Sequence, residues 1–318
     1  MVGKLTPNTM LSASRLPAVM GLSKYRSAND ELQMSIDAIQ GKEPDPISNE
    51  AMDWGNKMEP TILMEAANRL GLTQLNIDHE EAYFHDEWPL SCSLDGTATG
   101  SMEEITTDPE RGIYVVGQDS IRLEGTGVLE AKLTSMDPED VPPLWRGPLQ
   151  LQAQMAIYKA NWGCIATLYK GIELRLFLFA LHKPTLETIE KVSKDFQDRL
   201  DRFKNTGQID FYPAQNLKDA ARTYQTADDE DPVVLDEYCE SLVTLYQENK
   251  TKMEKMTEEN SQIQLQIMEI MKNRKYAVAG KYQISWPTRT YKPQPAKITP
   301  AKEGYTVRQS TLTIKESK

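Results

Sequence analysis

The sequence has few of the residues on which several protein classes depend. Its 318 residues contain only three cysteines and three histidines, too few cysteines for a disulfide framework, a four-thiolate iron–sulfur cluster or an all-cysteine zinc site. No run approaches 18 apolar residues, and the first nine residues lack the apolar stretch of a secretory signal. We therefore expect a protein of the reducing cytoplasm without a membrane span. The missing Gly-x4-Gly-Lys-Ser/Thr pattern argues against a nucleotide-driven motor.

Charge is distributed unevenly along the chain. The formal net charge is −11, yet residues 272–318 contain eleven Lys and Arg residues against two acidic residues, a balance of +9, so the first 271 residues carry −20. An acidic body with a basic end is typical of chains that contact nucleic acid, and it is equally typical of a solubilising tail. Charge alone leaves both interpretations open.

Residues 1–207 combine helical and strand patterns in one predicted domain. The expected helices span about 49–70, 148–161 and 185–203. The expected strands span 82–85, 90–94, 113–116, 127–133, 163–170 and 172–181. Helices before, between and after groups of strands indicate an α/β fold, with a central mixed sheet flanked by helices.

The remaining chain is expected to form three further segments. Residues 208–232 form an irregular acidic linker. Residues 233–274 form a long helical arm, because apolar positions recur at steps of three and four from 235 to 270. This arm packs either on its own domain or in an intermolecular coiled coil. Residues 275–318 form a small, strand-rich basic tail, whose aromatic residues either stack on nucleic-acid bases or form a hydrophobic cluster.

A carboxylate–lysine set is the strongest candidate for chemistry. Asp95 ends an apolar segment, while Glu130 and Lys132 lie two residues apart and therefore share one face of a predicted strand. Two carboxylates and one ammonium meeting near strand ends suit Mg²⁺ or Mn²⁺, with the lysine orienting water or offsetting charge on phosphorus. Taken separately, Asp-Gly is an ordinary turn and Glu-x-Lys an ordinary solvated strand face.

Two further polar features accompany this set. Glu59 lies on the apolar stripe of the 49–70 helix, next to Pro60. A carboxylate there is costly to bury unless it is paired or bound to metal, although a partly exposed Glu near a helix start is also ordinary. Gln152 belongs to a run of three alternating glutamines, and its amide suits either a water or metal-bound phosphate, or a plain polar helix surface.

In order along the chain, these motifs resemble those of the PD-(D/E)xK nucleases. More narrowly, the sequence is similar to the phage lambda exonuclease and YqaJ-type viral recombinase family, over about residues 10–205. Leu94 stands where the family usually has proline, which leaves the neighbouring carboxylate intact. The motifs that carry the resemblance are Ser12-Ala-Ser-Arg15, Gly21-Leu-Ser-Lys-Tyr-Arg26, Gly55-x-x-x-Glu59, Ser93-x-Asp95-Gly96, Glu130-x-Lys132 and Gln152-x-Gln154-x-x-x-Tyr158.

The resemblance implies a restriction-endonuclease-like core and roles for the polar residues. Asp95, Glu130 and the backbone carbonyl of Ala131 would ligate Mg²⁺, with Mn²⁺ as an alternative. Lys132 would assist the attacking water. Glu59 would orient a metal-bound water or a second ion, and Gln152 would support the metal–phosphate geometry.

The same resemblance implies contacts with the DNA end. Ser14, Arg15 and Ser93 fall where the family contacts that end, and Arg26 is a weaker candidate. The family's usual arginine just upstream of the opening motif has no counterpart, because Pro7 occupies that region.

The resemblance also implies an activity and partners. Members are typically Mg²⁺-dependent 5′→3′ exonucleases on linear duplex DNA that serve phage recombination in the bacterial cytoplasm. They often form toroidal homotrimers and work with a single-strand annealing protein. Two alternatives remain at this point: a non-catalytic DNA-binding or scaffold protein on the same fold, and an endonuclease of the same superfamily.

Overall fold

The computed structural model describes residues 6–42, 49–224 and 233–289. It divides into two compact units, Met1–Thr223 and Tyr224–Lys318. The boundary falls inside the predicted 208–232 linker. Residues 225–232 of that linker and residues 290–318 of the predicted basic tail lie outside the described residues. No helix in the described segments is long and apolar enough to span a membrane.

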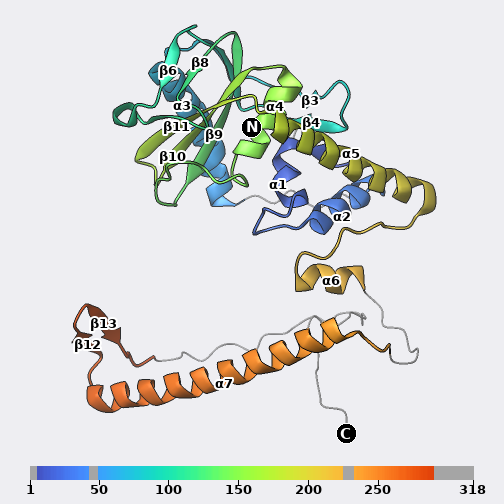
Figure 1. The fold of residues 1–318 in the computed structure, drawn as a ribbon. Coiled ribbons are helices and arrows are strands. Elements are labelled where there is room, and N and C mark those ends of the chain that lie inside the picture. Colours follow the sequence, from blue (N-terminus) through green and yellow to red (C-terminus); the bar gives the residue numbers. More distant parts are fainter. Residues whose placement is uncertain (1–5, 43–48, 225–232, 290–318) are drawn as a thin grey trace, which may run out of the picture. The chain divides into compact units, whose positions relative to one another are not determined.

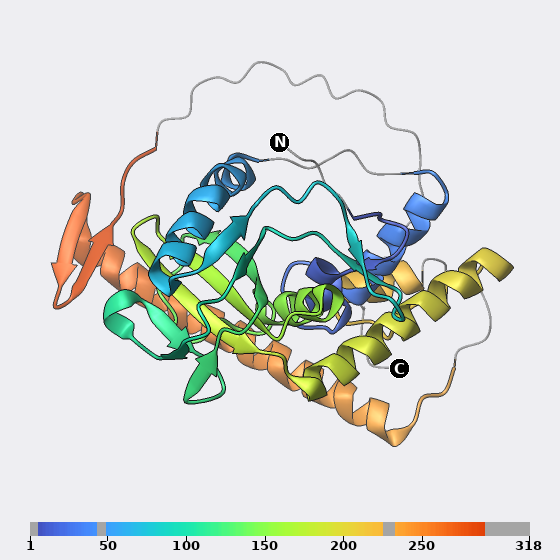
Figure 2. The same cartoon turned by 90° about the horizontal axis from the view of Figure 1, so that it is seen from above.

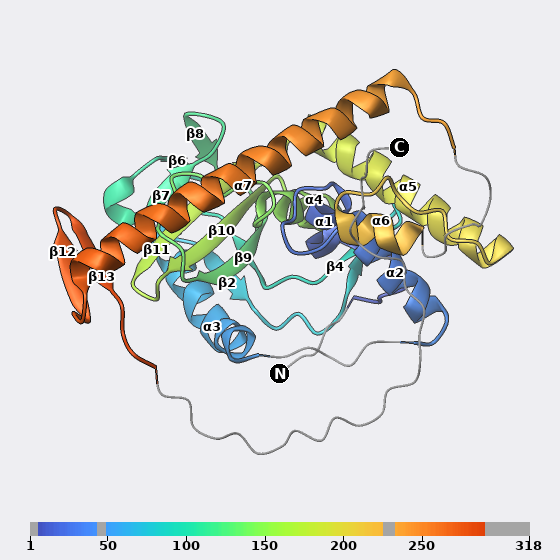
Figure 3. The same ribbon diagram turned by 90° about the horizontal axis from the view of Figure 1, so that it is seen from below.

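The first unit is built on a six-stranded mixed sheet. The strand order is β2-β5-β9-β10-β11-β7, with β9 parallel to β10 and antiparallel to β5; the neighbours β11, β10 and β9 can be followed in Figure 3. The strands of the sheet are β2 (Thr73–Asn76), β5 (Gly96–Thr99), β7 (Ile113–Val115), β9 (Thr126–Thr134), β10 (Trp162–Tyr169) and β11 (Glu173–Ala180). The predicted central mixed sheet is therefore confirmed.

Two smaller sheets and six α-helices complete the described part of this unit. Strand β4 (Leu90–Cys92) pairs with β1 (Leu11–Ser12) and β3 (Tyr83–Phe84), and β6 (Glu104–Thr106) pairs with β8 (Ser120–Arg122). Figure 2 shows α3 (light blue) well apart from the pair α1 and α2 (dark blue). The helices are α1 (Leu16–Val19), α2 (Ala28–Ile39), α3 (Glu50–Leu70), α4 (Pro148–Tyr158), α5 (Lys183–Thr206) and α6 (Leu217–Thr223).

Two hydrophobic clusters fill the opposite faces of the sheet. On one face, α4 and α5 contribute residues such as Leu151 and Phe196, which are fully buried. On the other face, α3 contributes Leu63, which is buried together with Leu129 of β9. Figure 1 shows the strands between α3 and the α4–α5 layer. Strand β9 is thus covered on both faces and paired along both edges, as is its neighbour β10.

The described part of the second unit consists of the long helix α7 (Glu237–Met271) and a hairpin of β12 (Tyr276–Ala279) and β13 (Tyr282–Ser285). This confirms the predicted long C-terminal helix and the strands that follow it. Asp236 caps α7, because its side chain accepts a hydrogen bond from the Cys239 N–H.

The three cysteines are free thiols in different surroundings. Cys92 and Cys164 are buried in the two clusters of the first unit, whereas Cys239 is half-buried on α7.

Candidate active site

Strand β9 presents Glu130 and Lys132 on one face of the sheet. Leu129, Ala131 and Leu133 belong to the hydrophobic cluster on the opposite face. This alternation confirms the predicted division of the strand into a polar and an apolar face. Strand β10 pairs with residues 128–134 of β9 and so holds the backbone at both charged residues, whereas β5 pairs with residues 126–129, just before them.

Asp95 reaches this face from the neighbouring strand. It directly precedes β5, and its Oδ2 accepts a hydrogen bond of 2.9 Å from the N–H of Ala131, the residue between Glu130 and Lys132. The predicted Asp-Gly turn is therefore wrong in one respect: Gly96 begins a strand that pairs with β9. The pairing of β5 with β9 brings Asp95 next to β9, and the three side chains are therefore close together.

The Glu130 carboxylate is buried and held by three donors. Only 1% of the residue is exposed. Oε1 accepts hydrogen bonds from Lys132 Nζ and, at 2.7 Å, from Gln150 Nε2, while Oε2 accepts from Gln154 Nε2 at 2.7 Å. Gln154 Nε2 also donates to the Ser93 carbonyl at 3.0 Å. Burial of this charge is offset by a charge-assisted bond and two amide donors.

The glutamines of α4 divide between two tasks. Gln150 and Gln154 lie four residues apart and therefore share the helix face that meets Glu130. Gln152 points elsewhere: its Nε2 donates to the Ala180 carbonyl at 2.8 Å, and its Oε1 accepts from the His182 N–H at 2.8 Å. The expectation that Gln152 supports the polar site is corrected, because helical spacing places its two neighbours there instead. The four-residue spacing is the sequence signal that identifies them.

Electrostatics link Glu59 of α3 to the same site. Glu59 is half-buried, and burial, followed by the charge of Glu130, raises its pKa. Burial and the Glu130 charge also raise the pKa of Asp95 well above its usual range, with Glu59 adding to the effect. Burial alone would lower the pKa of Lys132, but Glu130 and Asp95 outweigh it and raise that pKa. The lysine is therefore a stable ammonium ion beside mutually repelling acids.

The chemical type of the side chains in the site suits a hard divalent cation. Three carboxylates and one ammonium leave a net negative site, and oxygen atoms are the ligands that Mg²⁺ and Mn²⁺ prefer. Within the described segments, no group of three or more His, Cys, Asp or Glu side chains is placed so that it could by itself hold a metal ion. Oε1 of Glu130 already accepts two hydrogen bonds, whereas Oε2 accepts one and keeps a lone pair for a cation.

The candidate DNA contacts differ in their availability. Ser14 is exposed, with its Oγ 3.3 Å from Ser12 Oγ. Ser93 is half-buried beside Asp95 in the sequence. Arg26 is exposed, and its Nε lies 3.0 Å from a carboxylate oxygen of Glu31. These three residues are accessible to solvent, and their contact with DNA remains a prediction.

Arg15 has a structural place instead. It is 5% exposed, and its Nε lies 2.6 Å from Glu31 Oε2. Its other nitrogens donate to Ser35 Oγ at 2.8 Å and to the Met10 carbonyl at 2.9 Å, and the guanidinium lies over the Phe196 ring. The expectation that Arg15 binds a DNA phosphate is corrected, because its donors are already used inside the fold.

An Asp ahead of one strand and a Glu-x-Lys pair on the next form the arrangement expected from the PD-(D/E)xK resemblance. Residues 6–161 match the model of the YqaJ-like viral recombinase domain. This segment therefore belongs to the YqaJ-type family that the motifs indicated. No curated protein matches the chain.

Solved structures similar to the chain include two exonucleases. LHK-Exo, an alkaline exonuclease from Laribacter hongkongensis, was solved in complex with dAMP; it has 17% sequence identity and a TM-score of 0.43, and the match covers 61% of this chain and 89% of that chain. A phage-related exonuclease from Haemophilus somnus has 10% identity and a TM-score of 0.41, with 63% of this chain and 96% of that chain covered.

Proposed function

We propose that the protein is a metal-dependent deoxyribonuclease that degrades linear duplex DNA from its ends, with 5′→3′ polarity, in phage recombination or DNA degradation. The observation that carries the proposal is the hydrogen bond from the Ala131 N–H to Asp95, which joins Asp95 to the strand of Glu130 and Lys132. The YqaJ-like domain match over residues 6–161 supports a nuclease rather than another hydrolase.

The residues have distinct tasks in this proposal. Asp95, Glu130 and the Ala131 carbonyl hold Mg²⁺, and the cation supplies Lewis-acid stabilisation of charge on the phosphate oxygens. The Lys132 ammonium orients the attacking water and offsets negative charge on phosphorus. Glu59 accepts a hydrogen bond from that water or holds a second ion.

Gln150 and Gln154 keep the Glu130 carboxylate in place from α4, as amide partners of metal-bound carboxylates do. The exposed Ser14 and half-buried Ser93 are the proposed contacts for the phosphate at the DNA end.

A nuclease assay with labelled duplexes tests the proposal. We expect Mg²⁺-dependent release of nucleotides from linear duplex DNA labelled at its 3′ or 5′ ends, abolished by EDTA, with closed circular DNA intact. Asp95→Asn and Glu130→Gln should each lower turnover at least about a hundredfold. The matched control is Asp119→Asn, which removes an exposed carboxylate from the loop between β7, an edge strand of the sheet, and β8, and should leave turnover unchanged.

The outcomes separate the alternatives. Cleavage of closed circles would identify an endonuclease. DNA binding without turnover in Mg²⁺ or Mn²⁺ would identify a non-catalytic protein and overturn the proposal. Equal turnover in Asp95→Asn, Glu130→Gln and the control would reject the site while leaving nuclease activity in place.

The partners follow from the same proposal. We propose that the chain assembles into homotrimers and works with a single-strand annealing protein. Light scattering of the purified full chain measures the mass of the assembly, and a mass near three times 36.0 kDa is the expected result.

A further inference from the structure

The segment 272–289, named here the basic hairpin, has a charge opposite to that of the helix before it. It contains five basic residues and no acidic residue: Lys272, Arg274, Lys275, Lys281 and Arg289. Helix α7 carries seven Glu and three Lys residues, a balance of −4. The positive charge is therefore concentrated at one end of the second unit, where it can attract a polyanion.

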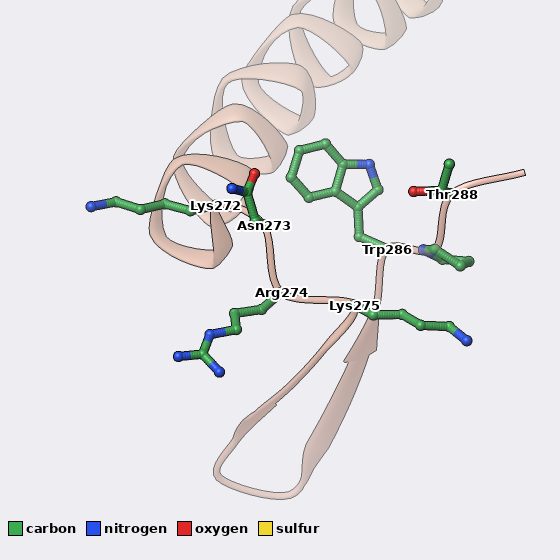
Figure 4. A pocket seen from close by; sticks show the side chains of 7 residues that line it. Lys272, Asn273, Arg274, Lys275, Trp286 and Thr288 are labelled. Carbon is green, nitrogen blue, oxygen red and sulfur yellow. The ribbon is translucent and has the colours of Figure 1, made fainter.

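Backbone pairing fixes one tryptophan within the basic hairpin. Strands β12 and β13 pair in antiparallel register from Tyr276–Ser285 to Ala279–Tyr282. The Trp286 N–H donates to the Lys275 carbonyl at 2.9 Å, which extends the pairing by one residue. Figure 4 shows the Trp286 indole beside the last turn of α7, with Lys272, Arg274 and Lys275 extending away from it in different directions. An indole and several cations thus line one hollow.

The large aromatic side chains of the basic hairpin are not buried in a hydrophobic core. Met271 is buried and Ile284 is half-buried, and both line a second hollow against α7 together with one side of Trp286. Trp286 nevertheless remains 44% exposed, and Tyr276 and Tyr282 remain 66% and 65% exposed. Large exposed rings are costly in water and commonly mark a binding surface.

Each exposed tyrosine lies beside a cation. Lys275 Nζ lies 5.0 Å from the Tyr276 ring centre, and Lys281 Nζ lies 5.4 Å from the Tyr282 ring centre. Basic side chains that neutralise phosphates, interleaved with rings on which bases stack, form the chemistry that recognises single-stranded nucleic acid. A duplex offers only the phosphates, because its base faces are already stacked.

We propose that the basic hairpin binds single-stranded DNA, with Lys272, Arg274 and Lys275 on phosphates and Trp286 stacked on a base. The choice of DNA over RNA rests on the proposed nuclease function. The binding itself needs neither metal nor hydrolysis, so it is a second nucleic-acid site, in a different unit from Asp95 and Glu130.

Binding measured without turnover tests this site. The full chain, in EDTA, is titrated against a fluorescein-labelled oligothymidine, and affinity is read from fluorescence anisotropy. Trp286→Ala should weaken binding roughly five- to a hundredfold, since stacking on one base contributes about 1–3 kcal/mol. Replacing Lys272, Arg274 and Lys275 together by Gln should weaken binding and reduce the salt dependence by about 2 in log–log slope.

A matched control removes the same charge from the same unit. Lys250, Lys252 and Lys255 lie on exposed positions of α7, and their joint replacement by Gln should leave affinity and salt slope within about twofold of wild type. Trp286→Phe keeps a ring and an apolar contact, so it should bind nearly as well. The quenching of tryptophan fluorescence by the oligonucleotide should be smaller in Trp286→Phe than in wild type.

Two results overturn the proposal. In the first, neither the Trp286 variants nor the basic triple variant differs from the α7 control. In the second, Trp286→Ala and the quenching are unaffected, while the triple variant loses affinity equally for oligothymidine, duplex DNA and heparin, which indicates nonspecific attraction. If Asp95→Asn loses turnover but still binds oligothymidine, the proposal of single-stranded DNA binding is unaffected. The binding assay and the nuclease assay therefore test the two proposals separately.

Discussion

At the scale of single residues, the polar site depends on how one buried carboxylate is surrounded. Glu130 receives donors from Lys132 on its own strand and from Gln150 and Gln154 on α4. Gln154 also holds the carbonyl of Ser93, two residues before Asp95 in the chain. One amide therefore connects the two segments that carry the acids.

The first prediction concerns these amides. Gln154→Ala should lower kcat/KM for duplex DNA about 10- to 100-fold, because Glu130 loses a donor that orients it. Gln152→Ala, the matched control two residues away, removes hydrogen bonds to Ala180 and His182 and should cost about 1–3 kcal/mol of stability with turnover retained. Turnover and urea unfolding are measured for both variants. A greater loss of activity in Gln152→Ala than in Gln154→Ala would contradict the prediction and assign Gln152 to the site.

The second prediction concerns the buried Arg15–Glu31 pair. Arg15→Met should lower the free energy of unfolding by about 3–5 kcal/mol, since Glu31 is left buried with only Arg26 as a partner. Adding Glu31→Leu should recover part of that loss. Urea unfolding of the single and double variants measures the effect. Unchanged stability with a selective loss of affinity for 5′-phosphorylated ends would instead return Arg15 to a DNA-binding role.

The sequence predicted which residues form the polar face of β9, but it did not predict which partners individual polar side chains such as Arg15 contact. The two-residue spacing of Glu130 and Lys132 was sufficient, because alternation is a local property of a strand. Arg15 could not be assigned locally: its partner Glu31 lies 16 residues away, and an arginine in a short polar motif looks the same whether it is buried or exposed. Only tertiary structure distinguishes those cases.

At the scale of elements, the close packing of β9 against β10 requires a glycine. Gly127 lies in β9 opposite Ala98 of β5. An added Cβ at this position would lie 2.3 Å from a ring carbon of Trp162, which is 1% exposed and donates from Nε1 to the Glu124 carbonyl. The indole therefore fills the space that a side chain would need.

The third prediction follows from this packing. Gly127→Ala should destabilise the protein by about 1–3 kcal/mol, because Trp162 or β9 must move. Gly55→Ala is the matched control, since nothing lies within 4 Å of its added Cβ on α3. In a helix interior that change should stabilise by up to about 1 kcal/mol. Thermal and urea unfolding measure both, and equal effects of the two substitutions would contradict the packing argument.

Helix α6 is held on the start of α2 by a polar network. Ser27 caps α2, and its Oγ donates to the buried Asp219 of α6 at 2.6 Å. Asp30 of α2 accepts from the Ser27 N–H at 3.0 Å and from Arg222 of α6 at 2.8 Å. Partial burial would raise the pKa of Asp30, but the Ser27 N–H and the Arg222 charge outweigh it and hold that pKa at about 2.

The fourth prediction is a pH dependence of stability from Asp30. Asp30→Ala should cost about 1 kcal/mol at pH 7, through loss of the capping box and the Arg222 pair. Because the folded-state pKa lies below the unfolded value of about 3.9, this stabilisation is complete above pH 4 and disappears as the pH falls towards 2. Urea midpoints at pH 7, 4 and 2.5 measure the gap between wild type and variant; a gap of constant size would contradict the assignment.

Long elements were predictable from periodicity, and short ones were not. The helix predicted over 49–70 corresponds to α3, and the strand predicted over 127–133 corresponds to β9. Strand β5 was missed because Gly-Thr-Ala-Thr after an Asp looks like a turn, and only pairing with β9 makes it a strand. Helix α6 was missed because its seven residues lie in a segment predicted as linker, where contacts with α2 determine the structure.

At the scale of the whole molecule, the two units have different contents. The first unit contains both hydrophobic clusters and every candidate active-site residue. The second contains α7 and the basic hairpin, with one buried apolar residue, Met271, among its described residues. The first unit therefore has the core that independent folding requires, and the second has little of one.

The fifth prediction is that residues 1–224 fold and hydrolyse DNA without the second unit. This fragment keeps the sheet, α6 and its contacts with α2. Its thermal unfolding should be cooperative, and its Mg²⁺-dependent turnover of linear duplex DNA should persist, while its affinity for oligothymidine in EDTA should fall. Circular dichroism, the nuclease assay and anisotropy test the three parts. An aggregated or unfolded fragment would show that the second unit is needed for the stability of the first.

The unequal burial of the three thiols offers a route to labelling the native chain. Burial raises the pKa of both Cys92 and Cys164 to about 12, so these core sulfurs stay protonated and shielded from reagents. Cys239, on the first turn of α7, is only half-buried. A maleimide dye added at neutral pH should couple there first. The protein can thus be labelled with a single fluorophore on α7 without any substitution, and the dye can report on α7 when DNA binds.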